Sequence, residues 1–329
     1  MVRRHVGVSQ PQAAAAGGRA PANRRLSAAG RASVAVLVAA VLGVGLLPGG
    51  PAKGGAGADG GAEGIVFRMR DPQGDDHGPG HYRYPEDATF VPGLFDLTDF
   101  TVRTAADQVH FDLTFRAMVN PWEAPEGFHH QLVDIYIDTT PGQGRTEPLR
   151  PGPQVRFHPA HGWEVRIRAA PFGGTRLHWA HDPPDAPGQA RGLRAAVLGD
   201  GRTLRVSVPK SLLGMPQPAW RYYVLVGGFD PFGADDYRAV GPTATQWRFG
   251  GDATGAGPRV IDLLAPRGWR SQARQLGSFA APKDGPAVHA LVHPVGPGRP
   301  WPALAGAGLA GVLAAGAAWR WRHLRRPRS

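Results

Sequence analysis

Two segments of the chain combine an Asp-Pro pair, a glycine and a pair of aspartates, at residues 71–76 and 230–236. Carboxylates held this close together repel one another unless a cation lies between them. Tight turns of Asp and Gly can direct carboxylate and carbonyl oxygens at one point, and these are the ligands that calcium prefers. The pattern predicts a structural calcium site, shared by the two segments or duplicated in them, with the candidate ligands Asp71, Asp75, Asp76, Asp230, Asp235 and Asp236.

An ion-free interpretation stays open, because Asp, Gly and Pro also favour solvated turns that bind nothing. Neither segment has the spacing of an EF-hand loop, so the exact ligand set is not fixed by the sequence. If calcium binds, we expect it to tie the first turn of the fold to its last strands and to stiffen the loops nearby.

Several tryptophans could stack on sugar rings, which is how proteins bind the apolar face of a saccharide. Trp122 lies in a proline-flanked loop close to His130, and Trp179 lies between two histidines near a loop. We therefore predict carbohydrate contacts for Trp122, His130 and Trp179. The other tryptophans of the body, Trp163, Trp220 and Trp247, are expected in the core.

Three other chemistries have some support in the sequence. Zinc could be bound by the two H-x-x-H pairs, His158 with His161 and His178 with His181. Haem could be bound by Met118 with His130. An acid and a base could be supplied by Glu123, Glu126 and Glu164. The chain has no helical H-E-x-x-H motif and no nucleophile motif such as G-x-S-x-G. The sequence therefore predicts a protein that is not an enzyme.

The charge distribution and the lack of cysteine argue against nucleic-acid binding and against cysteine-based sites. The formal net charge is +11, but residues 1–58 and 298–329 hold 13 of the 37 Lys and Arg residues and no acid. That leaves 24 basic against 26 acidic residues in the middle, so the body is near neutral and no nucleic-acid partner is expected. The absence of cysteine excludes disulfides and thiolate metal sites.

The two ends predict export and membrane attachment. Residues 1–58 have a long basic region, an apolar run and small residues before Asp59, the pattern of a signal peptide. Residues 301–321 are apolar with tryptophans at the edges, which predicts a transmembrane helix. We expect a linker at 59–64, a Pro/Gly stalk at 281–300, a basic cytoplasmic tail at 322–329 and an extracellular body on a single-pass protein of the cell membrane.

The body, residues 65–280, alternates apolar and polar residues in several short stretches, as in 109–115, 133–138 and 163–168. This period of two, with frequent turn residues and no long helical pattern, predicts an all-β antiparallel sandwich of the jelly-roll or immunoglobulin-like kind. Such a fold would bring the first turn and the last strands close enough to share a site.

A series of motifs in the body resembles a known family. They are Asp71-Pro72, Gly74-Asp75-Asp76, Gly78-Pro79-Gly80, Tyr84-Pro85, Phe95-Asp96-Leu97, Asn120-Pro121-Trp122, Tyr136-Ile137-Asp138-Thr139, Gly227-Gly228-Phe229-Asp230-Pro231-Phe232-Gly233, Asp236-Tyr237-Arg238, Trp247-Arg248-Phe249-Gly250-Gly251 and Ile261-Asp262-Leu263-Leu264. In this order they resemble the C-terminal module of glucodextranase, which is similar to DOMON-like and family-9 carbohydrate-binding sandwiches. The resemblance implies polysaccharide binding or surface attachment, often with calcium. Residues 1–64 do not hold a glycosidase domain, so the resemblance is not expected to bring a hydrolytic role.

The combined expectation is a membrane-anchored, extracellular module that recognises an α-glucan or the cell wall and contains structural calcium. The alternative is a surface scaffold that binds a protein partner, such as a glycosidase or an S-layer component, without contacting sugar. Exposed tryptophans beside a groove would favour sugar, whereas a flat apolar patch would favour a protein partner.

Overall fold

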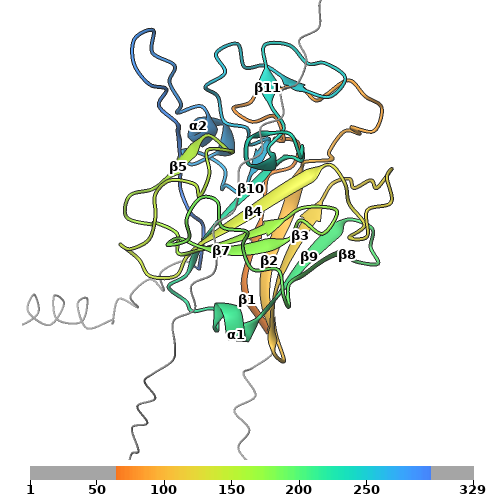
Figure 1. Ribbon diagram of the computed structural model, residues 1–329, viewed down its shortest axis with the longest axis vertical. Coiled ribbons are helices and arrows are strands. Elements are labelled where there is room, and N and C mark those ends of the chain that lie inside the picture. The colour runs from red at the N-terminus through yellow and green to blue at the C-terminus, as the bar shows by residue number, and fades with distance from the viewer. Residues whose placement is uncertain (1–63, 298–329) are drawn as a thin grey trace, which may run out of the picture. The chain divides into compact units, whose positions relative to one another are not determined.

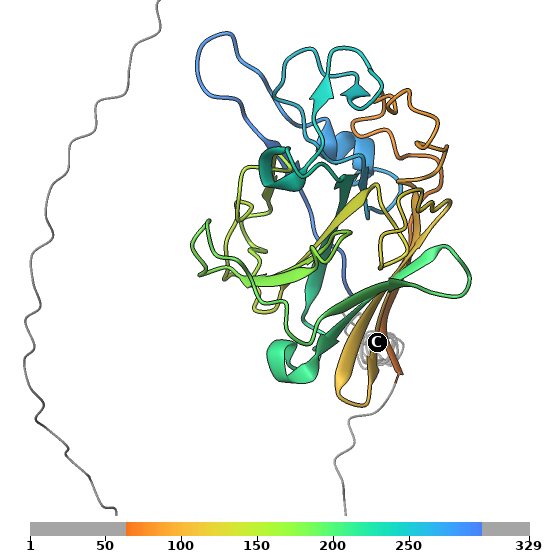
Figure 2. The same cartoon turned by 45° about the vertical axis from the view of Figure 1, so that its right-hand side comes forward.

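The computed structural model describes residues 64–297, which form a sandwich of two five-stranded sheets (Figures 1 and 2). The first sheet has the order β1-β2-β3-β9-β8 and the second the order β13-β10-β4-β6-β7, and all neighbours are antiparallel. The strands of the first sheet are β1 (Gly64–Arg70), β2 (Leu97–Ala105), β3 (Gln108–Phe115), β8 (Arg194–Val197) and β9 (Thr203–Pro209). Those of the second are β4 (Gln131–Asp138), β6 (Val165–Ala169), β7 (Arg176–Trp179), β10 (Arg221–Gly228) and β13 (Asp262–Leu263).

Short elements complete the fold. The pairs β5 (Val155–Phe157) with β14 (Ala290–Val292), and β11 (Val240–Gly241) with β12 (Phe249–Gly250), are parallel. The helical turns are α1 (Lys210–Leu213), η1 (Ala234–Asp236) and α2 (Gln272–Leu276). The predicted all-β, antiparallel sandwich is thereby confirmed.

Alternation along the strands builds the core between the sheets. Phe111 and Leu113 of β3 point inward and are fully buried, as are Ile135 of β4 and Val224 of β10. Burial of such side chains contributes about 1.5–3 kcal/mol each, and it fixes the register because a shift of one residue would expose them all.

The outer faces of the two sheets differ. The first sheet presents polar side chains, including Asp112, which binds Arg103 and Arg205. The outer face of the second sheet is covered by loops, which form a second core around Tyr136 and Trp163. Trp163 is fully buried, and Trp220 of the main core is 5% exposed, as predicted for both.

The predicted stalk does not hold for residues 288–297, which pack on the sandwich. β14 pairs with β5, and the backbone of Val295 exchanges hydrogen bonds with that of Tyr222. Ala290, Val292 and Val295 are buried against the sandwich. Within residues 64–297 no helix is long and apolar enough to span a membrane. The predicted signal peptide (1–58), transmembrane helix (301–321), cytoplasmic tail (322–329) and most of the linker (59–64) lie outside the described residues.

Candidate functional site

Three aspartates from distant parts of the chain meet where β1 ends and β13 begins. Asp71 follows β1, Asp75 lies in the next turn, and Asp262 is the first residue of β13. One carboxylate oxygen from each lies within 4.8 Å of the others. Asp96, directly before β2, is bound to the same turn, because its Oδ2 accepts a hydrogen bond of 2.8 Å from the Gly74 N–H. We call these four residues the carboxylate centre.

Backbone N–H groups hold three of the four carboxylates in place, and Asp262 accepts through both of its oxygens. Asp71 Oδ1 accepts from the backbone N–H of Ala265 at 2.9 Å, and Asp262 Oδ2 accepts from that of Leu97 at 2.6 Å. The remaining oxygens Asp71 Oδ2, Asp75 Oδ1 and Asp96 Oδ1 are buried without any hydrogen-bond partner. Buried carboxylate oxygens normally have partners, so this arrangement fits a bound cation.

The raised pKa values of the carboxylate centre also fit a bound cation. Burial and the neighbouring charges of Asp75 and Asp96 raise the pKa of Asp71 to about 9, and burial with the charges of Asp96 and Asp76 raises that of Asp75 to about 6. Burial and the charge of Asp71 also raise the pKa of Asp262. Among residues 64–297, Arg116 alone forms an ion pair with the centre, at 3.4 Å from Asp96.

Gln272 of α2 locks the turn that carries Asp75 against β13. Its amide Nε2 donates to the backbone oxygens of Asp75, Gly78 and Ile261, and its Oε1 accepts from the Leu263 N–H at 2.6 Å. The side chain is 2% exposed, so these bonds are shielded from water. Local sequence could not predict this support, because Gln272 and Asp75 are 197 residues apart.

Asp76, predicted as a ligand, points elsewhere. Its carboxylate accepts a hydrogen bond from the Tyr84 hydroxyl, whose oxygen accepts from the Phe95 N–H at 3.1 Å. Asp76 therefore joins the turn to the main core and is not part of the three-carboxylate group.

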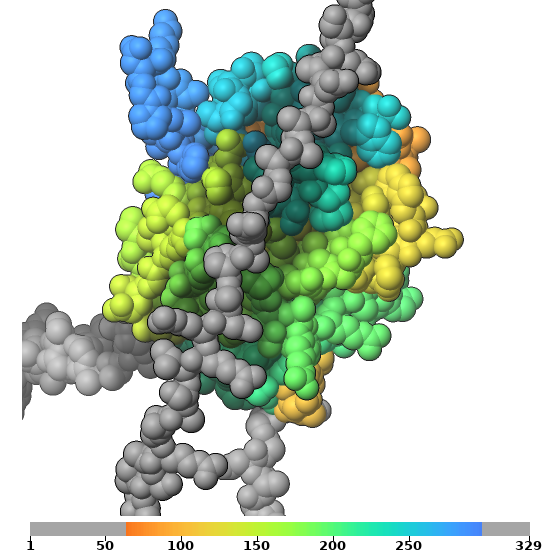
Figure 3. All heavy atoms as spheres, in the orientation of Figure 1, coloured from red at the N-terminus to blue at the C-terminus, as the bar shows by residue number. Residues whose placement is uncertain are grey.

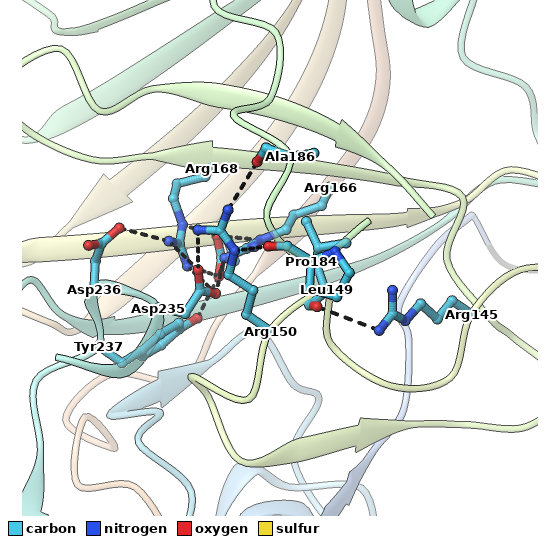
Figure 4. Close-up of polar contacts among 11 residues, drawn as sticks. Arg145, Leu149, Arg150, Arg166, Arg168, Pro184, Ala186, Asp235, Asp236 and Tyr237 are labelled. Carbon is cyan, nitrogen blue, oxygen red and sulfur yellow. Dashed lines mark hydrogen bonds and ion pairs between the residues drawn. The ribbon is translucent and has the colours of Figure 1, made fainter. Parts of the chain in front are cut away.

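The second aspartate segment forms a buried ion-pair cluster (Figure 4). Arg166 and Arg168 project from β6 and both bind Asp134 of β4 through two hydrogen bonds of 2.8–3.1 Å. Asp235 binds both arginines, at 2.6 and 2.9 Å, and Asp236 binds Arg168 at 3.0 Å. The prediction that this segment shares the early turn's cation site is therefore corrected: its positive partners are arginine side chains.

The cluster stabilises a strained loop. Asp235 and Asp236 have left-handed backbones with φ of 48° and 58°, which is unfavourable for residues other than glycine. Burial alone would raise the pKa of Asp134, but the charges of Arg166 and Arg168 outweigh burial and hold it below its usual range. Asp230, the third predicted ligand here, accepts from the Phe232 N–H at 3.1 Å within its own turn.

Aromatic side chains from separate loops lie close together at the surface of the sandwich. The segments near residues 125 and 230–250, which carry most of them, adjoin in the space-filling view (Figure 3). Trp122 is 43% exposed and Trp247 is 40% exposed, with ring centroids 6.0 Å apart. The ring of His129 lies 3.8 Å from Trp122, and exposed Phe172 lies 5.3 Å from His129. We call Trp122, His129, Phe172 and Trp247 the aromatic surface.

A cavity of about 540 Å³ adjoins this surface. It is lined by His129, Ala170, Pro171, Phe172, Gly174, Phe229, Pro231, Asp236 and Arg238. Burial and the charge of Arg238 lower the pKa of His129 to about 4, so the ring is neutral at pH 7 and can both donate and accept a hydrogen bond. An aromatic wall with a few polar groups is typical of saccharide sites.

The other two predicted carbohydrate residues have different positions. His130 is fully buried, with its ring 4.1 Å from Phe90 and 5.2 Å from Trp122, so it supports the surface from beneath. Burial and His129 lower its pKa to about 3. Trp179 is partly buried in β7 and packs against the main core, and its ring stacks with His181 at 6.3 Å. Neither residue contributes an exposed face beside Trp122.

The alternative chemistries lack an assembled site in the part of the chain that the structure describes. Neither H-x-x-H pair belongs to a group of three metal ligands, and His161 binds the carboxylate of Asp138 at 2.7 Å. Glu126 accepts from the backbone N–H of Phe172 and Gly173, and Glu164 binds Thr139. These glutamates thus stabilise loops.

The sequence predictions did not include Asp96, Asp262, His129, Phe172 and Trp247 among the site residues. The prediction that Trp247 lies in the core is wrong, since it is 40% exposed. Asp96 and Asp262 stood inside two of the motifs quoted above, which was the only signal for them.

A family model described as the C-terminal binding module, SLH-like, of glucodextranase matches residues 66–293. No curated protein matches the chain.

Proposed function

Because the chain belongs to the family of SLH-like C-terminal binding modules of glucodextranase, we propose that residues 64–297 bind a polysaccharide through the aromatic surface and perform no catalysis. The observation that carries this proposal is the pair of exposed tryptophans, Trp122 and Trp247, beside a cavity of about 540 Å³. Large exposed aromatic groups cost solvation free energy, so their clustering beside a hollow indicates a ligand.

The chemistry of each group fits a saccharide chain. Trp122 and Trp247 can cover the C–H faces of sugar rings, and the neutral imidazole of His129 can bond a hydroxyl as donor or acceptor. Arg238 is fixed because its guanidinium donates to the backbone oxygens of Trp247 and Phe229, each at 2.6 Å. These bonds couple the tryptophan loop to the cavity wall, so the surface is organised before the ligand arrives.

We further propose that the carboxylate centre holds a structural calcium ion. Asp71, Asp75, Asp96 and Asp262 offer hard oxygen ligands, and three of their oxygens are buried without a partner. Bound calcium would neutralise the negative charge of these carboxylates. It would also join β1, the turn after it, and β13. Its role is stability, since none of these residues lines the cavity beside the tryptophans.

The cellular setting completes the proposal. A signal peptide at 1–58 and a membrane helix at 301–321 would place the module on the outer surface of the cell, where it meets an α-glucan or the cell wall. A protein partner, such as a surface glycosidase or an S-layer component, is the alternative ligand for the same aromatic surface.

Replacing Trp122 with alanine is expected to weaken polysaccharide binding at least ~10-fold, which corresponds to about 1.4 kcal/mol. The reason is that the stacking face is lost while the fold stays intact, since Trp122 is 43% exposed. Isothermal titration of the full chain with maltodextrin and with solubilised cell-wall polysaccharide measures this effect.

Trp269→Ala is the matched control, because Trp269 is 70% exposed and its ring contacts Arg270 and His293, neither of which belongs to the aromatic surface. Equal binding by both variants, or binding of a surface protein but of no polysaccharide, would contradict the proposed carbohydrate site.

A further inference from the structure

Two more cavities adjoin one another on the first turn cluster of the fold. One, of about 510 Å³, has Asp76, Arg83, Tyr84, Phe90 and Arg116 in its lining. The other, of about 660 Å³, has Arg83, Tyr84, Glu86, Thr243 and Ala244 in its lining. Arg83 and Tyr84 belong to both, and we call the combined hollow the Arg83 groove.

Two arginines, Arg83 and Arg116, bring positive charge to the Arg83 groove. The guanidinium of Arg83 is exposed and forms no ion pair or side-chain hydrogen bond with any described residue. The side chain of Arg116 is 48% exposed, and its contact with Asp96 is long, at 3.4 Å. Two acids also line the groove: Asp76 is buried and accepts a hydrogen bond from the Tyr84 hydroxyl, and Glu86 is exposed.

The groove lies beside the aromatic surface. The ring of Phe90, which lines the smaller cavity, is 5.8 Å from the ring of Trp247. Thr243 and Ala244, which line the larger cavity, belong to the loop that leads to Trp247, and Thr245 in that loop pairs with Arg248. A chain stacked on Trp122 and Trp247 would reach the groove with its next sugar rings.

We propose that the polysaccharide is acidic and that Arg83 binds one of its anionic groups in the Arg83 groove. This inference rests on the proposed function and specifies its ligand class. A guanidinium presents a planar pair of N–H donors that matches the two oxygens of a carboxylate or a phosphate, and an unpaired arginine makes no competing contact. Tyr84 supplies an aromatic wall, as expected for a site that holds a sugar ring.

Titration of the full chain at constant calcium tests the inference with three probes. These are an octasaccharide that contains glucuronate, the same octasaccharide with its carboxylates reduced to alcohols, and maltoheptaose phosphorylated at C6. We expect a charged probe to bind ~10-fold tighter than the reduced one. Arg83→Gln should remove this difference. Preference for the phosphorylated probe would identify phosphate as the anion.

Arg191→Gln is the control for loss of one positive charge. Arg191 is exposed next to Gly192, which packs on Pro209 at the opposite end of the first sheet. If the wild type binds neither charged probe more tightly than the reduced octasaccharide, or if Arg83→Gln keeps the preference, the acidic ligand is excluded and the carbohydrate site stands. If no probe binds at all, the proposed function itself fails, and this inference fails with it.

Discussion

Asp134→Ala is expected to lower the free energy of unfolding by about 3–5 kcal/mol, because it leaves two buried arginines without their main counter-charge. Arg166 and Arg168 are 0% and 4% exposed, and each donates two hydrogen bonds to Asp134. The Tyr237 hydroxyl also donates to this carboxylate, at 2.8 Å. Urea unfolding of the full chain, followed by tryptophan fluorescence, measures the loss.

Asp112→Ala is the matched control for this prediction. Asp112 also binds two arginines, Arg103 and Arg205, but their side chains are 38% and 29% exposed and can be solvated when the carboxylate is removed. We expect a change of at most ~1 kcal/mol for this variant. Equal losses of unfolding free energy in the two variants would show that burial does not determine how strongly the Asp134 cluster stabilises the fold.

Removal of calcium is expected to destabilise the protein by about 4 kcal/mol when the ion had been present at ~1,000 times its dissociation constant. The effect should depend on pH. Without a cation, Asp71 and Asp75 have pKa values of about 9 and about 6 in the folded state, against 3.8 ordinarily. The folded state therefore binds more protons than the unfolded state from about pH 4 to 9, and cation-free stability falls as the pH rises through this window.

Calcium binds the deprotonated carboxylates, so the gain in melting temperature on adding calcium should grow with pH over the same window. Thermal unfolding of the full chain in calcium and in EGTA, from pH 5 to pH 9, measures this dependence. In Asp71→Asn we expect a much smaller response to calcium at every pH. A calcium response that shrinks as the pH rises, or that survives in Asp71→Asn, would place the ion elsewhere or exclude it.

Local sequence was enough to locate half of the carboxylate centre. The Asp-Pro-x-Gly-Asp pattern identified Asp71 and Asp75, because the chemistry and the turn lie in adjacent residues. Asp262 could not be derived that way, since its place depends on the pairing of β13 with β10 and on a hydrogen bond to Leu97, 165 residues distant. Ligands brought together by strand pairing have no signature in local spacing.

The late aspartate segment shows why a repeated motif can have a different role. Its sequence is similar to that of the early turn, yet Asp235 and Asp236 face two arginines that the alternation of β6 points toward them. The same limit applies to the tryptophans. Alternation predicted the burial of Trp163 correctly, whereas Trp247 follows a loop, where no periodicity indicates which way the ring points.

Hydrogen–deuterium exchange of the full chain, with and without polysaccharide, is the most direct test of the central claim that the aromatic surface binds the glycan. The probes are maltodextrin and a glucuronate polysaccharide, each at constant calcium. We predict slower exchange in residues 116–130 and 229–252, which carry Trp122, His129 and Trp247. Protection confined to the polar outer face of the first sheet, or no protection by either polysaccharide, would contradict the account.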